Sequence, residues 1–204
     1  MHIAIVTAQA FNELDSFIAL GILNRVRRPN RRITICAADE TVTSMNGVTV
    51  HAQSRLAEAN DADVVLFGSG MRTREFVADP ALMAQLRLDP QRQLIGAQCS
   101  GALVLARLGL LRDIPACTDL STKPWVVEAG VQVLDQPFFA RGNVATAGGC
   151  LSSQYLAAWV LARTEGEAAA RSALHYVAPV GEKEQTVERA MRAIRAYLPA
   201  TAVA

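Results

Sequence analysis

Short apolar runs alternate along the chain with longer segments in which apolar residues recur at helical spacing. The runs are rich in β-branched residues and predict strands at residues 2–8, 31–39, 62–70 and 93–98. Between them, apolar side chains recur every three or four residues over 14–26, which predicts a helix. Strands separated by helices favour a mostly parallel sheet with helices on both faces.

Turn and cap residues predict the remaining elements. Asn46-Gly47 predicts the turn of a hairpin over 41–52, and Arg141-Gly142-Asn143 predicts a turn between two strands within 130–149. Further helices are predicted from Pro80, from Ser100, over 150–166 with Gly166 at the end, and over 182–198. The last of these helices is amphipathic, with one apolar face made of Val187, Ala190, Met191, Ile194 and Leu198.

Composition and charge narrow the class of protein. The chain has 204 residues, of which 51% are hydrophobic and 19% charged, so it is not a disordered protein. We expect a single domain over residues 1–198 and a frayed C-terminal tail over 199–204. A net charge of +1 without a basic stripe indicates neither nucleic acid nor membrane as a partner. No signal peptide or membrane-spanning run is evident, and we expect a cytoplasmic protein.

The four cysteines are widely spaced and form no CxxC pair or Cys/His cluster, which disfavours a disulfide framework and a zinc site. Cys99 differs from Cys36 and Cys117, which we expect to be packing residues. It directly follows the predicted strand 93–98, precedes a helix, and has small neighbours on both sides. A sharp strand-to-helix turn would strain its backbone and aim its side chain outward. The positive helix N-terminus would then lower the pKa of the thiol below that of free cysteine.

Four stretches resemble, in order, the motifs of the ThiJ/PfpI superfamily, which has the class I glutamine amidotransferase-like fold. GAQCSGA at 96–102 resembles the nucleophile elbow of that superfamily, and ELDSF at 13–17 resembles its acidic-residue motif. VVLFGSG at 64–70 resembles its oxyanion-hole loop, and residues 143–162 resemble the late strand, glycine turn and helix beside the same pocket. The resemblance covers nearly the whole chain. It implies a flavodoxin-like α/β fold, a three-layer sandwich with a nucleophile elbow.

The resemblance implies that Cys99 is the nucleophile and that Asp15 is the carboxyl group contacting its sulfur. The alternative is that Asp15 only caps the helix that it begins. Glu13 is a weaker candidate. The backbone amides of Ser69 and Ser100 are the implied oxyanion hole, although Ser69 stands where the family usually has a second glycine.

Other residues are implied at the same pocket. Cys150 is expected there either as a second thiol or as a small residue opening a helix. Asp119 stands where glutaminases and protease-like members carry a histidine, and it is expected to line the pocket or orient water. We expect the histidines to be structural or on the surface, which disfavours a Cys-His-Glu triad. The remaining expected pocket residues are Gly68, Gly148 and Gly149, and the histidines are His2, His51 and His175.

The Leu14-Asp15 pair resembles the isonitrile hydratase branch. This implies an enzyme in which the Cys99 thiolate attacks an isonitrile carbon, Asp15 supplies the proton, and water releases a formamide. The alternatives are a glyoxalase or deglycase acting on dicarbonyls, a non-catalytic redox sensor or chaperone, and a ligand-sensing relative of transcription regulators. We expect a small-molecule substrate, a homodimer, and no metal or organic cofactor.

Overall fold

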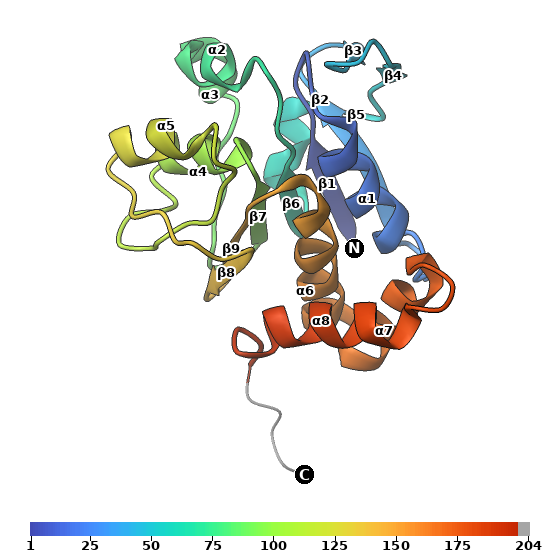
Figure 1. Ribbon diagram of the computed structural model, residues 1–204. Helices are drawn as coiled ribbons and strands as arrows, with labels where there is room; N and C mark the ends of the chain where they lie inside the picture. Colours follow the sequence, from blue (N-terminus) through green and yellow to red (C-terminus); the bar gives the residue numbers. More distant parts are fainter. Residues whose placement is uncertain (200–204) are drawn as a thin grey trace.

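The fold is built on one seven-stranded sheet, seen in a computed structural model that describes residues 1–199 (Figure 1). The strand order is β5–β2–β1–β6–β7–β9–β8. The bounds are β1 (His2–Val6), β2 (Arg32–Ala37), β5 (Ser54–Arg55), β6 (Val64–Phe67), β7 (Leu94–Gln98), β8 (Phe138–Arg141) and β9 (Val144–Ala147). The predicted hairpin forms a separate pair, β3 (Thr41–Thr43) and β4 (Thr49–His51). Except for Pro199, the predicted tail lies outside the described residues.

All neighbouring strands of the sheet are parallel except β8 and β9, which form the predicted strand–turn–strand unit. The order β2–β1–β6–β7–β9 is the flavodoxin-like order, so the predicted α/β class is confirmed. In register, Val6 lies opposite Phe67, and Ala97 lies between Phe67 and Thr146. The carboxyl ends of these four strands therefore meet at one edge of the sheet.

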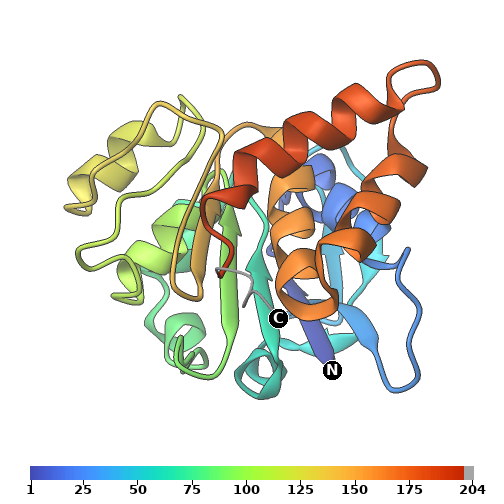
Figure 2. The same cartoon turned by 90° about the horizontal axis from the view of Figure 1, so that it is seen from below.

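Helices cover both faces of the sheet, as Figure 2 shows. On one face lie α1 (Glu13–Leu23), α6 (Ser153–Glu165), α7 (Glu167–Val177) and α8 (Lys183–Arg195), with η2 (Cys150–Ser152) leading into α6. On the other face lie η1 (Leu56–Asp61), α2 (Thr73–Ala78), α3 (Pro80–Met83), α4 (Gly101–Arg107) and α5 (Lys123–Glu128). The predicted three layers are confirmed.

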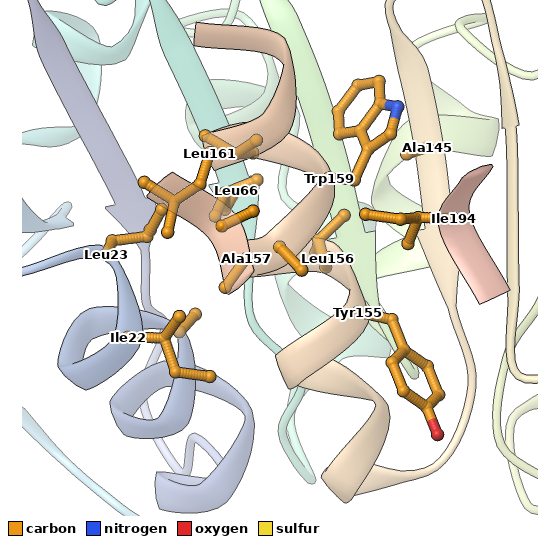
Figure 3. Packing of buried hydrophobic residues seen from close by; sticks show 14 of the residues in the cluster. Ile22, Leu23, Leu66, Ala145, Tyr155, Leu156, Ala157, Trp159, Leu161 and Ile194 are labelled. Carbon is orange, nitrogen blue, oxygen red and sulfur yellow. The ribbon is translucent and has the colours of Figure 1, made fainter. Parts of the chain in front are cut away.

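The alternation of side chains along β1 explains why two cores form. Ile3 and Ile5 belong to the cluster under α6, whereas Ala4 and Val6 belong to the cluster under α4, and all four are buried. Helix α6 lies against the middle of the sheet, with Leu156 and Trp159 fully buried (Figure 3). The predicted face of α8 closes this core through Val187, Ala190, Met191 and Ile194.

The structure differs from the prediction at several helices. Helix α3 ends at Met83 because Asn60 hydrogen-bonds to the carbonyl of Gln85 and the amide of Arg87, which replaces further helical bonds. Helices α2, α5 and α7 were not predicted, since each is short or has few large apolar residues. None of the helices within residues 1–199 is both long and apolar enough to span a lipid bilayer.

The packing of β7 against α6 generates a stability prediction. A methyl group on Gly96 would lie 2.7 Å from both Leu156 Cδ1 and Leu66 Cδ2, so Gly96→Ala should overpack the core and cost about 1–3 kcal/mol. Gly21 is the matched control because it lies in α1 with nothing within 4 Å of an added methyl group. Gly21→Ala should stabilise the protein by up to about 1 kcal/mol. Denaturant unfolding measures both changes, and equal stability of the two variants would contradict this packing.

Candidate active site

The backbone of Cys99 adopts a left-handed conformation with φ 47° at the junction of β7 and α4. Two hydrogen bonds hold it there. Its amide donates to the carbonyl of Ala147 over 2.8 Å, and its carbonyl accepts from Thr118 Oγ1 over 2.8 Å. Such a backbone costs about 1–3 kcal/mol for a residue other than glycine and persists only where neighbours enforce it. The predicted strand–helix elbow is therefore present.

Small residues around the elbow allow backbones to approach closely. An added methyl group on Gly101 would lie 2.7 Å from the carbonyl oxygen of Phe67. One on Gly148 would lie 2.4 Å from the carbonyl oxygen of Thr118. These contacts bring α4 against β6, and the turn after β9 against the segment that holds Cys99. Gly149 follows in that turn, and Gly68 follows β6.

Three reactive side chains meet beside the elbow. A carboxylate oxygen of Asp15, Cys99 Sγ and Cys150 Sγ all lie within 4.8 Å of one another. Asp15 is the third residue of α1 and is 2% exposed. It does not cap the helix, because Asn12 occupies the N-cap and accepts from the amide of Leu14 over 3.0 Å.

The oxygens of Asp15 have different surroundings. Oδ2 accepts a hydrogen bond from Ser69 Oγ. Oδ1 is buried and has no hydrogen-bond partner within the described part of the chain. The side chain of Ser69 is thus a direct partner of the candidate acid.

Two amides that sequence reasoning did not single out contact the sulfurs. Asn12 Nδ2 lies 3.1 Å from Cys150 Sγ, and Gln98 Nε2 lies 3.5 Å from Cys99 Sγ. Gln98 Nε2 also donates to the carbonyl of Gly149 over 2.7 Å. The only sequence signals for these residues are the position of Asn12 before a helix and of Gln98 before the nucleophile. Cys150 begins η2, and its sulfur lies within 4.8 Å of Cys99 Sγ.

The loop after β6 is bonded to the elbow. Ser100 Oγ accepts from the amide of Gly70 over 3.1 Å and lies 2.7 Å from Thr73 Oγ1. Thr73 is buried as well. Within residues 1–199, the backbone amides of Ser69 and Ser100 have no hydrogen-bond acceptor.

Asp119 stabilises the loop before α5. Its Oδ1 accepts from the amides of Ser121 and Thr122 over 2.9 Å, and its Oδ2 accepts from Thr122 Oγ1 over 2.6 Å. Its charge nevertheless reaches the site, because it raises the pKa of Cys99 and Asp15. Elsewhere, Glu13 accepts from Ser44 Oγ and Asn46 Nδ2, which ties the β3–β4 hairpin to α1.

The histidines lie in other elements. His2 is buried in β1 with its Nε2 2.8 Å from Thr34 Oγ1, whereas His51 in β4 and His175 in α7 are exposed. The groups that shift the pKa of Cys99 include no histidine. The remaining cysteines, Cys36 and Cys117, are fully buried, and all four cysteines are free thiols.

Burial governs the protonation of the site. It raises the pKa of Asp15, an effect that the hydrogen bond from Ser69 opposes. Burial, followed by the charges of Asp15 and Asp119, also raises the pKa of Cys99. Our expectation of a lowered thiol pKa and an outward-facing side chain is therefore wrong, since Cys99 is only 3% exposed. The N-terminus of helix α4 is not among the groups that shift this pKa.

Comparison with known proteins places this geometry in a family. The model of the DJ-1/PfpI family matches residues 1–163, whereas no curated protein gives a significant match. A cysteine-to-alanine mutant of a DJ-1 superfamily protein from Salmonella typhimurium is 26% identical, with a TM-score of 0.74 over 86% of this chain and 97% of that one.

Two more distant structures share the fold. A ThiJ/PfpI family protein from Pseudomonas syringae is 18% identical, with a TM-score of 0.76 over 95% of this chain and 87% of that one. Drosophila melanogaster DJ-1beta is 21% identical, with a TM-score of 0.72 over 86% and 96%. With the family match over most of its length and a buried cysteine at the strand–helix elbow, the chain belongs to the DJ-1/PfpI family.

Proposed function

We propose that this protein is a cysteine-dependent enzyme that hydrates isonitriles, with Cys99 as nucleophile and Asp15 as proton carrier. The observation that supports this most directly is the buried carboxyl group of Asp15 beside Cys99 Sγ, without a histidine among the groups that shift the pKa of that thiol. Amide hydrolysis needs a group that protonates a leaving amine. Addition to an isonitrile has no leaving group, so one thiol and one carboxyl group suffice.

In the first step, the sulfur of Cys99 bonds to the terminal carbon of R–N≡C while its proton passes to the Asp15 carboxylate. Asp15 returns the proton to the same carbon, which forms a thioimidate, R–N=CH–S–Cys99. The proton thus moves between two groups whose pKa values are both raised, and no free thiolate has to accumulate beforehand.

In the second step, water adds to the thioimidate carbon, and nitrogen takes a proton. Collapse of the adduct breaks the C–S bond, returns a proton to sulfur and releases R–NH–CHO. The backbone amides of Ser69 and Ser100 are the donors that we assign to the developing oxygen charge, because neither donates elsewhere within residues 1–199.

Exposed apolar side chains suit an apolar substituent on the substrate. Four of them adjoin site residues or the elbow loop in the sequence and are between 51% and 84% exposed. They are Leu14, Met71, Leu120 and Leu151.

A redox-sensing role is the second candidate, and the position of Cys150 favours it. Its sulfur lies within 4.8 Å of Cys99 Sγ, so a sulfenic acid formed on one sulfur has a thiol nearby. One similar structure is that of oxidized Toxoplasma gondii DJ-1, 18% identical with a TM-score of 0.72. A protein that is oxidised at Cys99 by peroxide but hydrates no isonitrile would support this candidate. The glyoxalase alternative has no comparable support. Asp119 stands where those branches usually carry a histidine, and both of its carboxylate oxygens accept hydrogen bonds from Thr122.

The proposed roles predict opposite effects of one substitution. Asp15→Asn should reduce isonitrile turnover about 10²–10⁴-fold by removing the proton carrier. It should also accelerate alkylation of Cys99 by iodoacetamide at pH 8, because loss of the nearby charge lowers the thiol pKa. Chromatography of the formamide product measures turnover, and mass spectrometry measures alkylation of Cys99.

Cys99→Ser should abolish isonitrile turnover, and Cys36→Ser should preserve it. Turnover by Cys99→Ser would refute Cys99 as the nucleophile.

Burial of Asp15 also predicts a pH dependence of stability. Because its pKa is raised in the folded state, the stability present below the ordinary aspartate pKa of 3.8 is lost as pH rises through the raised value. Asp15→Asn should therefore have a higher Tm than wild type at pH 7, and the difference should shrink toward pH 4.

Glu13→Gln is the control with the opposite sign. The hydrogen bond from Ser44 lowers the pKa of Glu13 in the folded state. The ionised Glu13 side chain therefore stabilises the fold above the ordinary glutamate pKa, and this stabilisation is lost as pH falls. This variant should have a lower Tm than wild type at pH 7. A pH-independent effect of Asp15→Asn would show that the carboxyl group is not desolvated.

A further inference from the structure

The Asp15–Cys99–Cys150 cluster has the composition and spacing of a metal site. Two sulfurs and one carboxylate oxygen lie within 4.8 Å of one another. A tetrahedral Zn²⁺ ion with Zn–S bonds of about 2.3 Å needs sulfurs about 3.8 Å apart, and the two sulfurs here lie within 4.8 Å of each other. The residues come from α1, the elbow after β7 and η2, so no sequence spacing indicates them.

The unpartnered oxygen of Asp15 is an independent indication of a ligand. Asp15 is 2% exposed, and its Oδ1 atom is buried without a hydrogen bond of full geometry within the described chain. Buried polar atoms are nearly always paired. Oδ2 is already bonded to Ser69 Oγ. One oxygen is therefore held by Ser69. The other has no partner of full hydrogen-bond geometry, and the thiols of Cys99 and Cys150, which act on the carboxyl group as weak hydrogen-bond donors, are the groups that a cation would deprotonate.

Each ligand also has an outer partner of the kind that orients metal ligands. Ser69 donates to Asp15, Asn12 Nδ2 lies 3.1 Å from Cys150 Sγ, and Gln98 Nε2 lies 3.5 Å from Cys99 Sγ. Hydrogen bonds from N–H groups stabilise thiolates, and outer-shell partners typically change metal affinity about 10–100-fold.

We propose that Asp15, Cys99 and Cys150 bind Zn²⁺, with a fourth coordination position left to water or another small ligand. Two thiolates with a carboxylate suit a borderline cation such as Zn²⁺ better than Mg²⁺ or Ca²⁺, which prefer oxygen. On binding, each sulfur replaces its proton with a bond to the metal, and the protons pass to solvent.

The inference goes beyond the proposed hydration and predicts that zinc opposes it. A sulfur bonded to Zn²⁺ cannot attack an isonitrile carbon in the same way as a free thiol. Cys150 is half-buried, whereas Cys99 is almost fully buried, so the proposed cation would approach from the Cys150 side. The zinc-bound form would be a resting or regulated state of the same site.

Metal binding by the full chain, reduced and freed of metal, tests the proposal. Competition with a chromophoric chelator measures the Zn²⁺ affinity, and Co²⁺ substitution reveals sulfur ligands by their charge-transfer absorption. Wild type should bind one equivalent, release protons and show sulfur-to-cobalt charge transfer. Cys150→Ser and Asp15→Asn should each weaken Zn²⁺ binding at least about 10-fold, and Cys150→Ser should reduce the charge-transfer absorption.

Cys36→Ser is the matched control, because Cys36 lies in β2 and donates to the carbonyl of Arg55, which a hydroxyl group can also do. It should bind Zn²⁺ like wild type. Cys150→Ala provides a second variant, and thermal unfolding confirms that each variant is folded. Unchanged Zn²⁺ affinity in both folded Cys150 variants, or a wild-type Co²⁺ complex without sulfur charge transfer, would overturn the proposal. All these readouts are independent of isonitrile turnover, so either proposal can fail alone.

Discussion

Two hydrogen bonds from distant segments hold the backbone of Cys99 in its left-handed conformation, and the geometry of the site depends on them. One ends at Ala147 in β9 and the other begins at Thr118 before α5. Left-handed backbone is unfavourable for cysteine, so folding of the surrounding sheet and loop supplies the free energy that keeps it. The glycines at 101 and 148 allow these segments to approach closely enough to form the bonds.

The same close packing explains the electrostatics of the site. Desolvation raises the pKa values of Asp15, Cys99 and Cys150, and the negative charges of neighbouring groups add to it. A carboxyl group and two thiols with raised pKa values can take part in two kinds of chemistry. They can pass one proton between a thiol and the carboxyl group, or they can exchange their protons for a cation.

The DJ-1/PfpI fold leaves room for both uses because its site is assembled from separate segments. The helix after β1 provides Asp15, the loop after β6 provides Ser69, the elbow after β7 provides Cys99, and the turn after β9 provides Cys150. The parallel register brings these segments to one edge of the sheet. Cys150 lies in one of these turns and outside the hydrophobic core clusters, so it adds a thiol to the site without taking part in the core.

Local patterns in the sequence determined the fold class and the elbow. The β-branched runs and the spacing of apolar residues depend on chain geometry within a few residues, so the strands and the large helices α1, α6 and α8 were predictable. The small residues around Cys99 likewise indicated a tight strand-to-helix turn before any contact was known.

Only the tertiary structure decided the protonation and the partners of the site. The pKa of Cys99 is raised by burial among residues distant in sequence and by the charges of Asp15 and Asp119, which local patterns do not place beside it. Asn12 and Gln98 contact the sulfurs, and Thr73 turns inward to Ser100, because the ends of four strands are brought together. Cys99 and Cys150 are 51 positions apart in the sequence, and parallel pairing of β7 with β9 brings them to one site.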